Sequence, residues 1–245
     1  MSGTLPPPSP IPLVVPGAPA QLPTTQTGSL TGRVVTIDPG HNGTNGSNPG
    51  FINSQIWNEV SVEFCDTAGT ATDAGYSESQ FNFDLAEYLA SDLRALGASV
   101  EMTRISNSGV GPCVNQRADI GNTARSDAAI SIHADGGPPS GRVFAVLEPV
   151  GVGPNNSIIS ASTQLAVDIR NEFAVVTGEP VSNYDGIDGI QPRSDLGGLN
   201  LSTVPKVVIE CANMRNSADA SLVVSDSWQA SAAAALAAGL TSYLQ

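Results

Sequence analysis

Short runs of apolar and β-branched residues alternate along this chain with longer stretches in which apolar residues recur every three or four positions. The short runs are typical of buried strands, and the longer stretches are typical of amphipathic helices. We expect strands at 34–38, 98–103, 128–133, 141–148 and 206–210. We expect helices at 77–96, 113–125, 157–174 and 227–244. Strands and helices in alternation predict an α/β fold, with a single open, twisted, mostly parallel sheet and helices on both of its faces.

The helix expected at 77–96 has the clearest local signals. Ser77 and Gln80 have the spacing of a capping box, and Gly97 follows the last apolar position, where glycine commonly ends a helix. Its apolar side is expected to consist of Phe81, Leu85, Tyr88, Leu89 and Leu96. The helix expected at 157–174 has an inner side of Ile158, Leu165, Ile169 and Phe173.

Two long polar segments interrupt the alternation. Residues 42–76 are rich in Gly, Asn, Ser and Thr, apart from the alternating pattern at 59–64. A loop of this length without structure would be unusual in a compact domain, so we expect a small hairpin inside it. The segment is either a wall or lid of a cleft or a surface insertion without a functional role. Residues 183–205 are rich in Gly and Asp and are expected to form a loop.

Proline, serine and threonine dominate residues 1–30, a composition that favours extended or disordered chain. We therefore expect a Pro-rich flexible tail at 1–30 and one folded domain at 31–245. The tail has neither a basic start nor an uninterrupted apolar segment, so it is not an intact signal peptide. If the protein is exported, its signal peptide is expected to be missing from this sequence.

Charge and hydropathy exclude several classes of partner. The formal net charge is −13, with ten Lys and Arg residues against 23 Asp and Glu. This charge argues against nucleic acid and against an anionic membrane surface as partners. The sequence also contains no apolar run long enough to span a bilayer.

The three cysteines have different surroundings. Cys65 and Cys113 lie in polar, Gly-rich segments, whereas Cys211 belongs to a run typical of a buried strand. We expect a disulfide between Cys65 and Cys113, which would close a loop of about fifty residues and stabilise the fold by about 4 kcal/mol on the chain-entropy model. A disulfide indicates an oxidising compartment. The alternative is three free thiols in a cytosolic protein.

The chain has only two histidines, and both follow short apolar runs that are succeeded by turn signals. His41 comes after the run 34–38 and the pair Pro39-Gly40, and His133 closes the run 128–133. Either histidine alone could be an ordinary polar residue at a strand end. A third apolar run closes with Glu210. Because ligands bind in the crevice outside the carboxyl ends of parallel strands, we expect the three side chains to converge, with a metal shared by the two histidines.

At this point the sequence resembles a known family, the zinc-dependent N-acetylmuramoyl-L-alanine amidases of peptidoglycan (Amidase_3), and in particular its stand-alone mycobacterial members. The order and spacing of the matching segments make the resemblance specific. These segments are Val34 to His41, Glu78 before an amphipathic helix, Met102 to Arg104, Arg117, Ala129 to Ala134 and Pro205 to Glu210.

The resemblance implies one Zn²⁺ ion held by His41, Glu78 and His133, with Glu210 as the catalytic carboxylate. Without the resemblance, Glu78 would be read as a carboxylate placed favourably in the first turn of a helix. Two imidazoles and one carboxylate suit a hydrolytic zinc site, because the fourth position stays open for water. The implied reaction is hydrolysis of the amide bond between the lactyl group of N-acetylmuramic acid and the L-alanine of the stem peptide, in peptidoglycan or in soluble muropeptides.

Two departures from the family pattern affect groups beside the expected metal. Asp135 stands where the family usually has Asn, and Cys211-Ala212-Asn213 follows Glu210 in place of a segment of Gly-Phe character. Arg104 and Arg117 match family positions too, and we expect them to pair with acidic residues rather than to bind substrate.

The resemblance further implies an exported protein, in the periplasm or cell wall, and we expect a monomer. Two alternatives remain open. One is a zinc carboxypeptidase or another amidohydrolase on the same fold, since a fold alone does not determine the substrate. The other is a non-catalytic wall-binding protein. Zinc content together with release of the L-alanine-linked peptide from muramyl dipeptide would separate the amidase from both.

Overall fold

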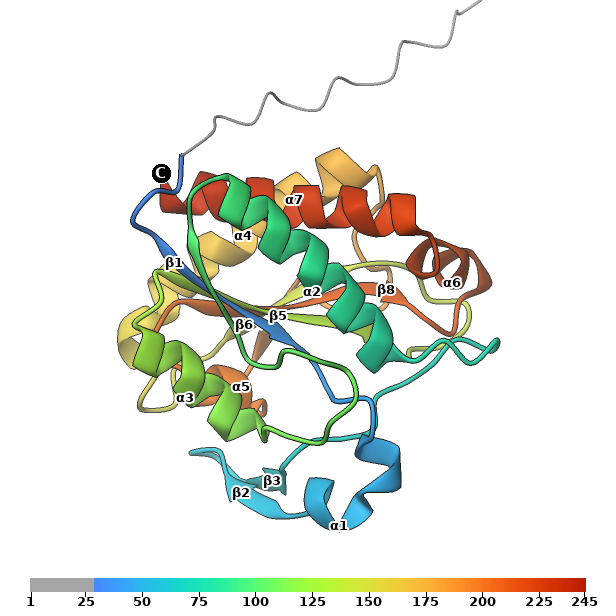
Figure 1. Cartoon of the computed structure of the whole chain (residues 1–245), viewed down its shortest axis with the longest axis horizontal. Helices are drawn as coiled ribbons and strands as arrows, with labels where there is room; N and C mark the ends of the chain where they lie inside the picture. The colour runs from blue at the N-terminus through green and yellow to red at the C-terminus, as the bar shows by residue number, and fades with distance from the viewer. Residues whose placement is uncertain (1–28) are drawn as a thin grey trace, which may run out of the picture.

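A computed structural model describes residues 29–245, so nearly all of the expected tail at 1–30 lies outside the described residues (Figure 1). Its centre is a six-stranded sheet in the order β4-β1-β5-β8-β6-β7. The strands are β1 (Val34–Pro39), β4 (Ser99–Met102), β5 (Ala128–Asp135), β6 (Ala145–Pro149), β7 (Ile190–Arg193) and β8 (Lys206–Asn213).

Strands β4, β1, β5 and β8 run parallel to one another, whereas β6 pairs with β8 in the antiparallel direction and β7 is parallel to β6. The predicted open, mostly parallel sheet is therefore confirmed. The two strands at the β7 edge run against the others.

Helices cover both faces of the sheet (Figure 1). One face carries the long helices α2 (Glu78–Ala95), α4 (Ile159–Thr177) and α7 (Asp226–Leu244), and the other carries the shorter α3 (Val114–Ala124) and α5 (Gly197–Asn200). The main core lies under the long helices, where Phe81, Ile130, Phe173, Ile209 and Leu236 are buried. Alanines and Gly239 let α7 approach α4 closely, because a Cβ at Gly239 would lie 2.8 Å from the Cα of Ile169.

The first turn of α2 confirms the predicted start of this helix. Ser77 is the N-cap, and its hydroxyl accepts a hydrogen bond from the backbone N–H of Gln80. Tyr88 does not belong to the buried side, since it is exposed while its neighbours Leu85 and Leu89 are fully buried. Its aromatic ring made Tyr88 look like part of the apolar side in the sequence, although it lies outside the face that packs on the sheet.

Strands β5 and β8 both continue beyond the residues expected to end them. His133 and Glu210 are direct neighbours in the parallel ladder, the register then shifts, and Asp135 pairs with Asn213. The small buried residues Ala134 and Ala212 extend the strands without an obvious β signal. The prediction that His133 and Glu210 stand at strand ends is therefore wrong.

Pro39 is also part of its strand, paired with Ile132, although the expected strand ended at residue 38. The pairing of β1 with β4 ends at Ile37 and Met102, and on the other side the N–H of Gly40 donates to the carbonyl of Ile132. No β4 residue faces Pro39. The absence of an N–H at Pro39 therefore costs the sheet no hydrogen bond.

The polar segments contain more structure than expected. The predicted hairpin in 42–76 is confirmed as β2 (Gln55–Trp57) with β3 (Val62–Phe64), preceded by η1 (Asn45–Ser47) and α1 (Pro49–Ile52). Residues 183–205 contain β7 and α5, which the Gly- and Asp-rich composition concealed.

The strand expected at 141–148 begins at Ala145, α4 is preceded by η2 (Asn156–Ile158), and α6 (Ser217–Val223) was not expected.

The predicted disulfide joins Cys65 to Cys113, and Cys211 is free and buried. The bridge connects the segment that follows the hairpin to the N-cap of α3. Two parts of the molecule that lie 48 residues apart in sequence are thereby fixed beside each other.

Candidate active site

A cavity of about 590 Å³ lies over the face of the sheet that carries α3 and α5. Alternate residues of β5 and β8 form its floor, among them Ser131 and His133 of β5 and Lys206 and Glu210 of β8. Side chains two positions apart project from the same face of a strand. We expected the site in the crevice beyond the strand ends. His41 does lie beyond the end of β1, whereas His133 and Glu210 reach the cavity from a face of the sheet.

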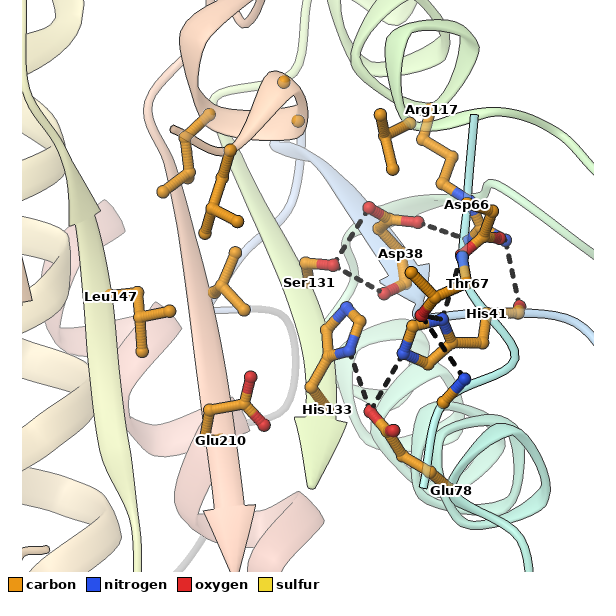
Figure 2. A pocket seen from close by; sticks show the side chains of 18 of the residues that line it. Asp38, His41, Asp66, Thr67, Glu78, Arg117, Ser131, His133, Leu147 and Glu210 are labelled. Carbon is orange, nitrogen blue, oxygen red and sulfur yellow. Dashed lines mark hydrogen bonds and ion pairs between the residues drawn. The ribbon is translucent and has the colours of Figure 1, made fainter. Parts of the chain in front are cut away.

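His41, Glu78 and His133 meet in this cavity (Figure 2). His41 lies on the loop after β1, Glu78 in the first turn of α2 and His133 on β5. One potential ligand atom from each lies within 4.8 Å of the other two. The Glu78 Oε1 atom is 2.9 Å from Nδ1 of His133 and 3.3 Å from Nε2 of His41.

Glycines make this close approach possible. A Cβ at Gly40 would overlap with the imidazole of His133, and a Cβ at Gly69 would lie 2.8 Å from both Oε2 of Glu78 and Cδ2 of His41. Any other residue at Gly40 would have to displace the ring. The loop that carries His41 and the loop that carries Gly69 can therefore approach the site this closely only with glycine at these two positions.

Glu78 has a more specific environment than the end of a helix requires. Its Oε2 atom accepts a hydrogen bond from the backbone N–H of Thr70 at 2.9 Å. Burial raises the pKa of Glu78, but the neighbouring His41 and His133 hold it well below the usual range. The carboxylate is thus ionised and directed at both imidazoles rather than at solvent.

Asp66 is a site residue that the sequence did not predict. Its Oδ1 atom lies 2.9 Å from Nδ1 of His41, which leaves Nε2 of that ring directed toward Glu78. Although burial lowers the pKa of His41, Glu78 and Asp66 raise it to about 10. An aspartate in a polar loop has no distinctive pattern. The available signal was its position directly after Cys65, one of the two cysteines predicted to form a disulfide.

Glu210 projects from β8 into the cavity beside His133 (Figure 2). Within the described part of the chain, its Oε2 atom is buried and has no hydrogen-bond partner. Burial raises the pKa of Glu210 well above the usual range, and the charges of Glu78 and Asp135 add to this effect. A buried carboxyl oxygen without a partner is costly in a protein, and such groups often have a catalytic role.

Arg104 and Arg117 hold the main chain that carries His41. Arg117 donates to the Asp38 carboxylate at 2.8 Å and to the carbonyls of Pro39 and His41 at 2.7 and 2.9 Å. Arg104 donates to the carbonyls of Pro39 and Gly40 at 2.9 and 3.2 Å. The expected pairing with an acidic residue is confirmed for Arg117, whereas the Arg104 side chain bonds mainly to backbone carbonyls.

These bonds fix an unusual backbone conformation. His41 has φ 57°, in the left-handed region that residues other than glycine rarely adopt. Such a conformation persists only where the surroundings determine it. The two arginines donate to the carbonyls on both sides of this residue and supply that constraint.

The two departures from the family pattern have structural partners. The Oδ2 atom of Asp135 accepts a hydrogen bond from the Tyr184 hydroxyl at 2.7 Å. The side-chain amide of Asn213 donates to the carbonyls of Pro138 and Gly141 at 2.8 and 2.9 Å. Both residues therefore fix the loop that follows β5, beside the cavity.

An open α/β sheet whose cavity gathers two imidazoles, an ionised carboxylate and a second, partnerless carboxyl group defines a hydrolytic enzyme. Residues 35–242 match the family Amidase_3, described as N-acetylmuramoyl-L-alanine amidase. The chain belongs to this family.

Three mycobacterial proteins are similar to the chain. It is 38% identical over 218 residues to the N-acetylmuramoyl-L-alanine amidase Rv3717 of Mycobacterium tuberculosis, with 88% of each chain covered. The crystal structure of the N-acetylmuramyl-L-alanine amidase Ami1 from Mycobacterium smegmatis matches with TM-score 0.83 and 40% identity, covering 88% of this chain and 98% of that one. Apo Ami1 from Mycobacterium abscessus matches with TM-score 0.83 and 37% identity, covering 88% of this chain and all of that one (100%).

Within residues 29–245, no helix has both the length and the apolar character needed to cross a membrane.

Proposed function

We propose that this protein is a zinc-dependent amidase that hydrolyses the bond between the lactyl group of N-acetylmuramic acid and the L-alanine of the stem peptide, in peptidoglycan or muropeptides. The observation that carries the proposal is the meeting of the His41–Glu78–His133 group with the partnerless oxygen of Glu210 in one cavity. Membership of the amidase family supplies the bond that is cleaved.

The three residues fit zinc by the chemistry of their donor atoms. Two imidazole nitrogens and a carboxylate oxygen are a common ligand set of catalytic zinc sites. The Asp66 carboxylate on Nδ1 of His41 is the outer hydrogen bond that orients most metal-binding imidazoles. Zinc bound here would polarise the scissile carbonyl and lower the pKa of a water molecule to about 7.

Glu210 is assigned the proton transfer. The carboxylate accepts a proton from the attacking water and passes it to the departing L-alanine nitrogen, so that both products leave in stable protonation states. Its raised pKa suits this role, because a carboxyl group with a pKa nearer neutrality both accepts and releases a proton readily. His41, Glu78 and His133 are assigned to holding the metal and take no part in the proton transfer.

The remaining parts of the proposal concern the whole protein. Residues 31–245 form the catalytic domain, and the protein acts outside the cytoplasm as a monomer. The Cys65–Cys113 disulfide supports an oxidising compartment, because such bonds are rare in reducing cytosol.

Zinc content and product identity test the proposed function together. Purified protein is expected to contain one zinc per chain by elemental analysis and to release L-alanyl-D-isoglutamine from muramyl dipeptide, as identified by mass spectrometry. Chelation should abolish the release and added zinc should restore it. Loss of only the C-terminal residue of a stem peptide would favour a carboxypeptidase, and zinc without hydrolysis of any substrate would favour a wall-binding protein.

A further inference from the structure

The hairpin β2–β3 carries an apolar face that none of the preceding chemistry uses. Directly opposed residues of an antiparallel pair share a face, and the opposed pairs are Gln55 with Phe64 and Trp57 with Val62. All four are exposed, with Trp57 at 57%, Val62 at 56% and Phe64 at 53%. Contiguous exposed apolar residues commonly mark a ligand groove or an interaction site.

The structure fixes this face at both ends of the hairpin. At its base, Cys65 is bonded to Cys113 and its N–H donates to the carbonyl of Ser54 at 2.7 Å. At its turn, the buried Asn58 donates through its side chain to the carbonyl of Asp195 at 3.2 Å, and its own carbonyl accepts from Asn200 at 3.0 Å. The hairpin is therefore a preformed surface, which lowers the entropic cost of binding.

The apolar face leads into the active-site cavity. Phe64 and its neighbour Glu63 line that cavity, whereas Trp57 and Val62 lie beyond it along the hairpin. In Figure 1 the hairpin lies on the side of the molecule that carries α3 and α5, away from the long helices. A ligand extending from the cavity along β3 would leave the site over this face.

Charge indicates which part of the substrate this face fits. The four exposed residues of the face are uncharged, in a protein with a net charge of −13, whereas the cavity lining includes the charged side chains of Asp135 and Arg193. On the muramoyl side of the scissile bond the lactyl carboxyl is consumed in the amide, so the attached sugars are neutral. The stem peptide carries free carboxylates.

We propose that Gln55, Trp57, Val62 and Phe64 bind the neutral sugar chain of the substrate, with pyranose rings lying against Trp57 and Phe64. Aromatic rings offer a large amphipathic surface to the C–H faces of sugars, and the Gln55 amide can bond to acetamido groups. This proposal rests on the proposed amidase function and adds a preference for polymeric or oligomeric glycan over single-sugar fragments.

A titration without turnover tests the surface directly. The probe is the neutral hexasaccharide of N-acetylglucosamine, which has no lactyl amide to cleave. Binding measured by calorimetry is expected to weaken roughly tenfold in Trp57→Ala, the size of loss that removing one aromatic contact with a ligand commonly causes. Tyr88→Ala, an exposed aromatic residue on α2, is the matched control and should bind as the wild type does.

Kinetics supply the second measurement. In Trp57→Ala and Val62→Ser the apparent KM for intact peptidoglycan should rise roughly tenfold with unchanged kcat, while kcat/KM for muramyl dipeptide stays the same. A single-sugar substrate does not extend to Trp57, which lies outside the cavity lining.

Three results would overturn the proposal: no binding of the hexasaccharide, equal binding by wild type and Trp57→Ala, or a Trp57→Ala defect only toward a free stem peptide. The titration also separates this proposal from the proposed function. If neither substrate is hydrolysed, the amidase assignment fails, and hexasaccharide binding still decides the role of the hairpin.

Discussion

His41 and His133 bring the same chemical group to one site, but different parts of the structure hold them. His133 belongs to the central strand β5, where the ladders with β1 and β8 and the core beneath fix its backbone. His41 lies on a loop in a left-handed conformation, fixed by two arginines, by Asp66 and, through Cys65, by a disulfide. A side chain on a loop can thus be positioned as precisely as one on a sheet when enough specific polar contacts fix the loop. Its position can then be lost through substitution of residues other than the histidine itself.

The largest effect is expected from the imidazoles themselves. His133→Ala or His41→Ala should abolish hydrolysis and lower zinc occupancy, because each substitution removes one of the three ligands. Glu78→Ala removes the third ligand and should weaken zinc binding as well. The fold should persist, since both histidines lie outside the hydrophobic core. Elemental analysis and circular dichroism measure the two properties. Full zinc content in either histidine variant would refute the ligand assignment.

On the sheet side, Glu210→Gln should keep its zinc and lose about 10²–10⁴-fold in kcat, the usual contribution of a general acid–base group. Glutamine preserves size and hydrogen bonding but cannot accept a proton at neutral pH. Glu148→Gln on the neighbouring strand β6 is the matched control, because Glu148 is part of the sheet but does not line the cavity. Zinc loss in proportion to activity would instead make Glu210 a ligand.

On the loop side, Asp66→Asn should weaken zinc affinity by about 10–100-fold, the effect typical of removing the carboxylate that orients a metal-binding histidine. Competition with a chromogenic chelator measures this affinity. Asp73→Asn is the control from the same segment, since Asp73 is exposed and pairs with Arg215 at the surface. Unchanged affinity in Asp66→Asn would show that the His41 ring is held without its carboxylate partner.

The smallest effect on the site is expected from the disulfide. Replacing Cys65 and Cys113 by serine should lower the free energy of unfolding by up to about 4 kcal/mol on the chain-entropy model. It should weaken zinc affinity less than Asp66→Asn does, because Arg117 still lies 3.5 Å from the Asp66 carboxylate. Denaturant titration and the chelator assay measure the two losses. A loss of affinity equal to that of Asp66→Asn would mean that the disulfide alone positions Asp66.

The same contrast explains what the sequence could predict. β1, β5 and β8 were recognisable because buried parallel strands appear as apolar, β-branched runs, and these runs pointed to His41, His133 and Glu210. Glu78 was found only through the family resemblance, because a carboxylate in a first helical turn is common for electrostatic reasons alone.

The parts of the site and of the fold that lie in loop-like segments could not be predicted from residue patterns. Asp66 owes its role to contacts with residues distant in sequence, and no local periodicity marks such contacts. The edge strand β7 contains Pro192 in a Gly- and Asp-rich segment, so its composition indicated a loop. Strands β5 and β8 continue through Ala134 and Ala212. Alanine has a low intrinsic preference for strands, so its place in a strand depends on the neighbouring strands of the sheet.

Asp38, which lies on β1 and lines the cavity, has a consequence for tolerance of acid. Its carboxylate accepts hydrogen bonds from Arg117, Lys206, Thr103 and Ser131, and so connects α3, the three strands β1, β5 and β8, and the residue that follows β4. Burial raises the pKa of Asp38, but Lys206, Arg117 and the Thr103 hydrogen bond together bring it well below its usual range. A carboxyl group whose pKa is depressed by folding contributes stability above its unfolded pKa, and that contribution disappears only as the pH falls through the lower, folded value. The carboxylate therefore stays charged, and keeps the loop of His41 joined to the strand of His133, at acidities that already neutralise most carboxyl groups on the protein surface.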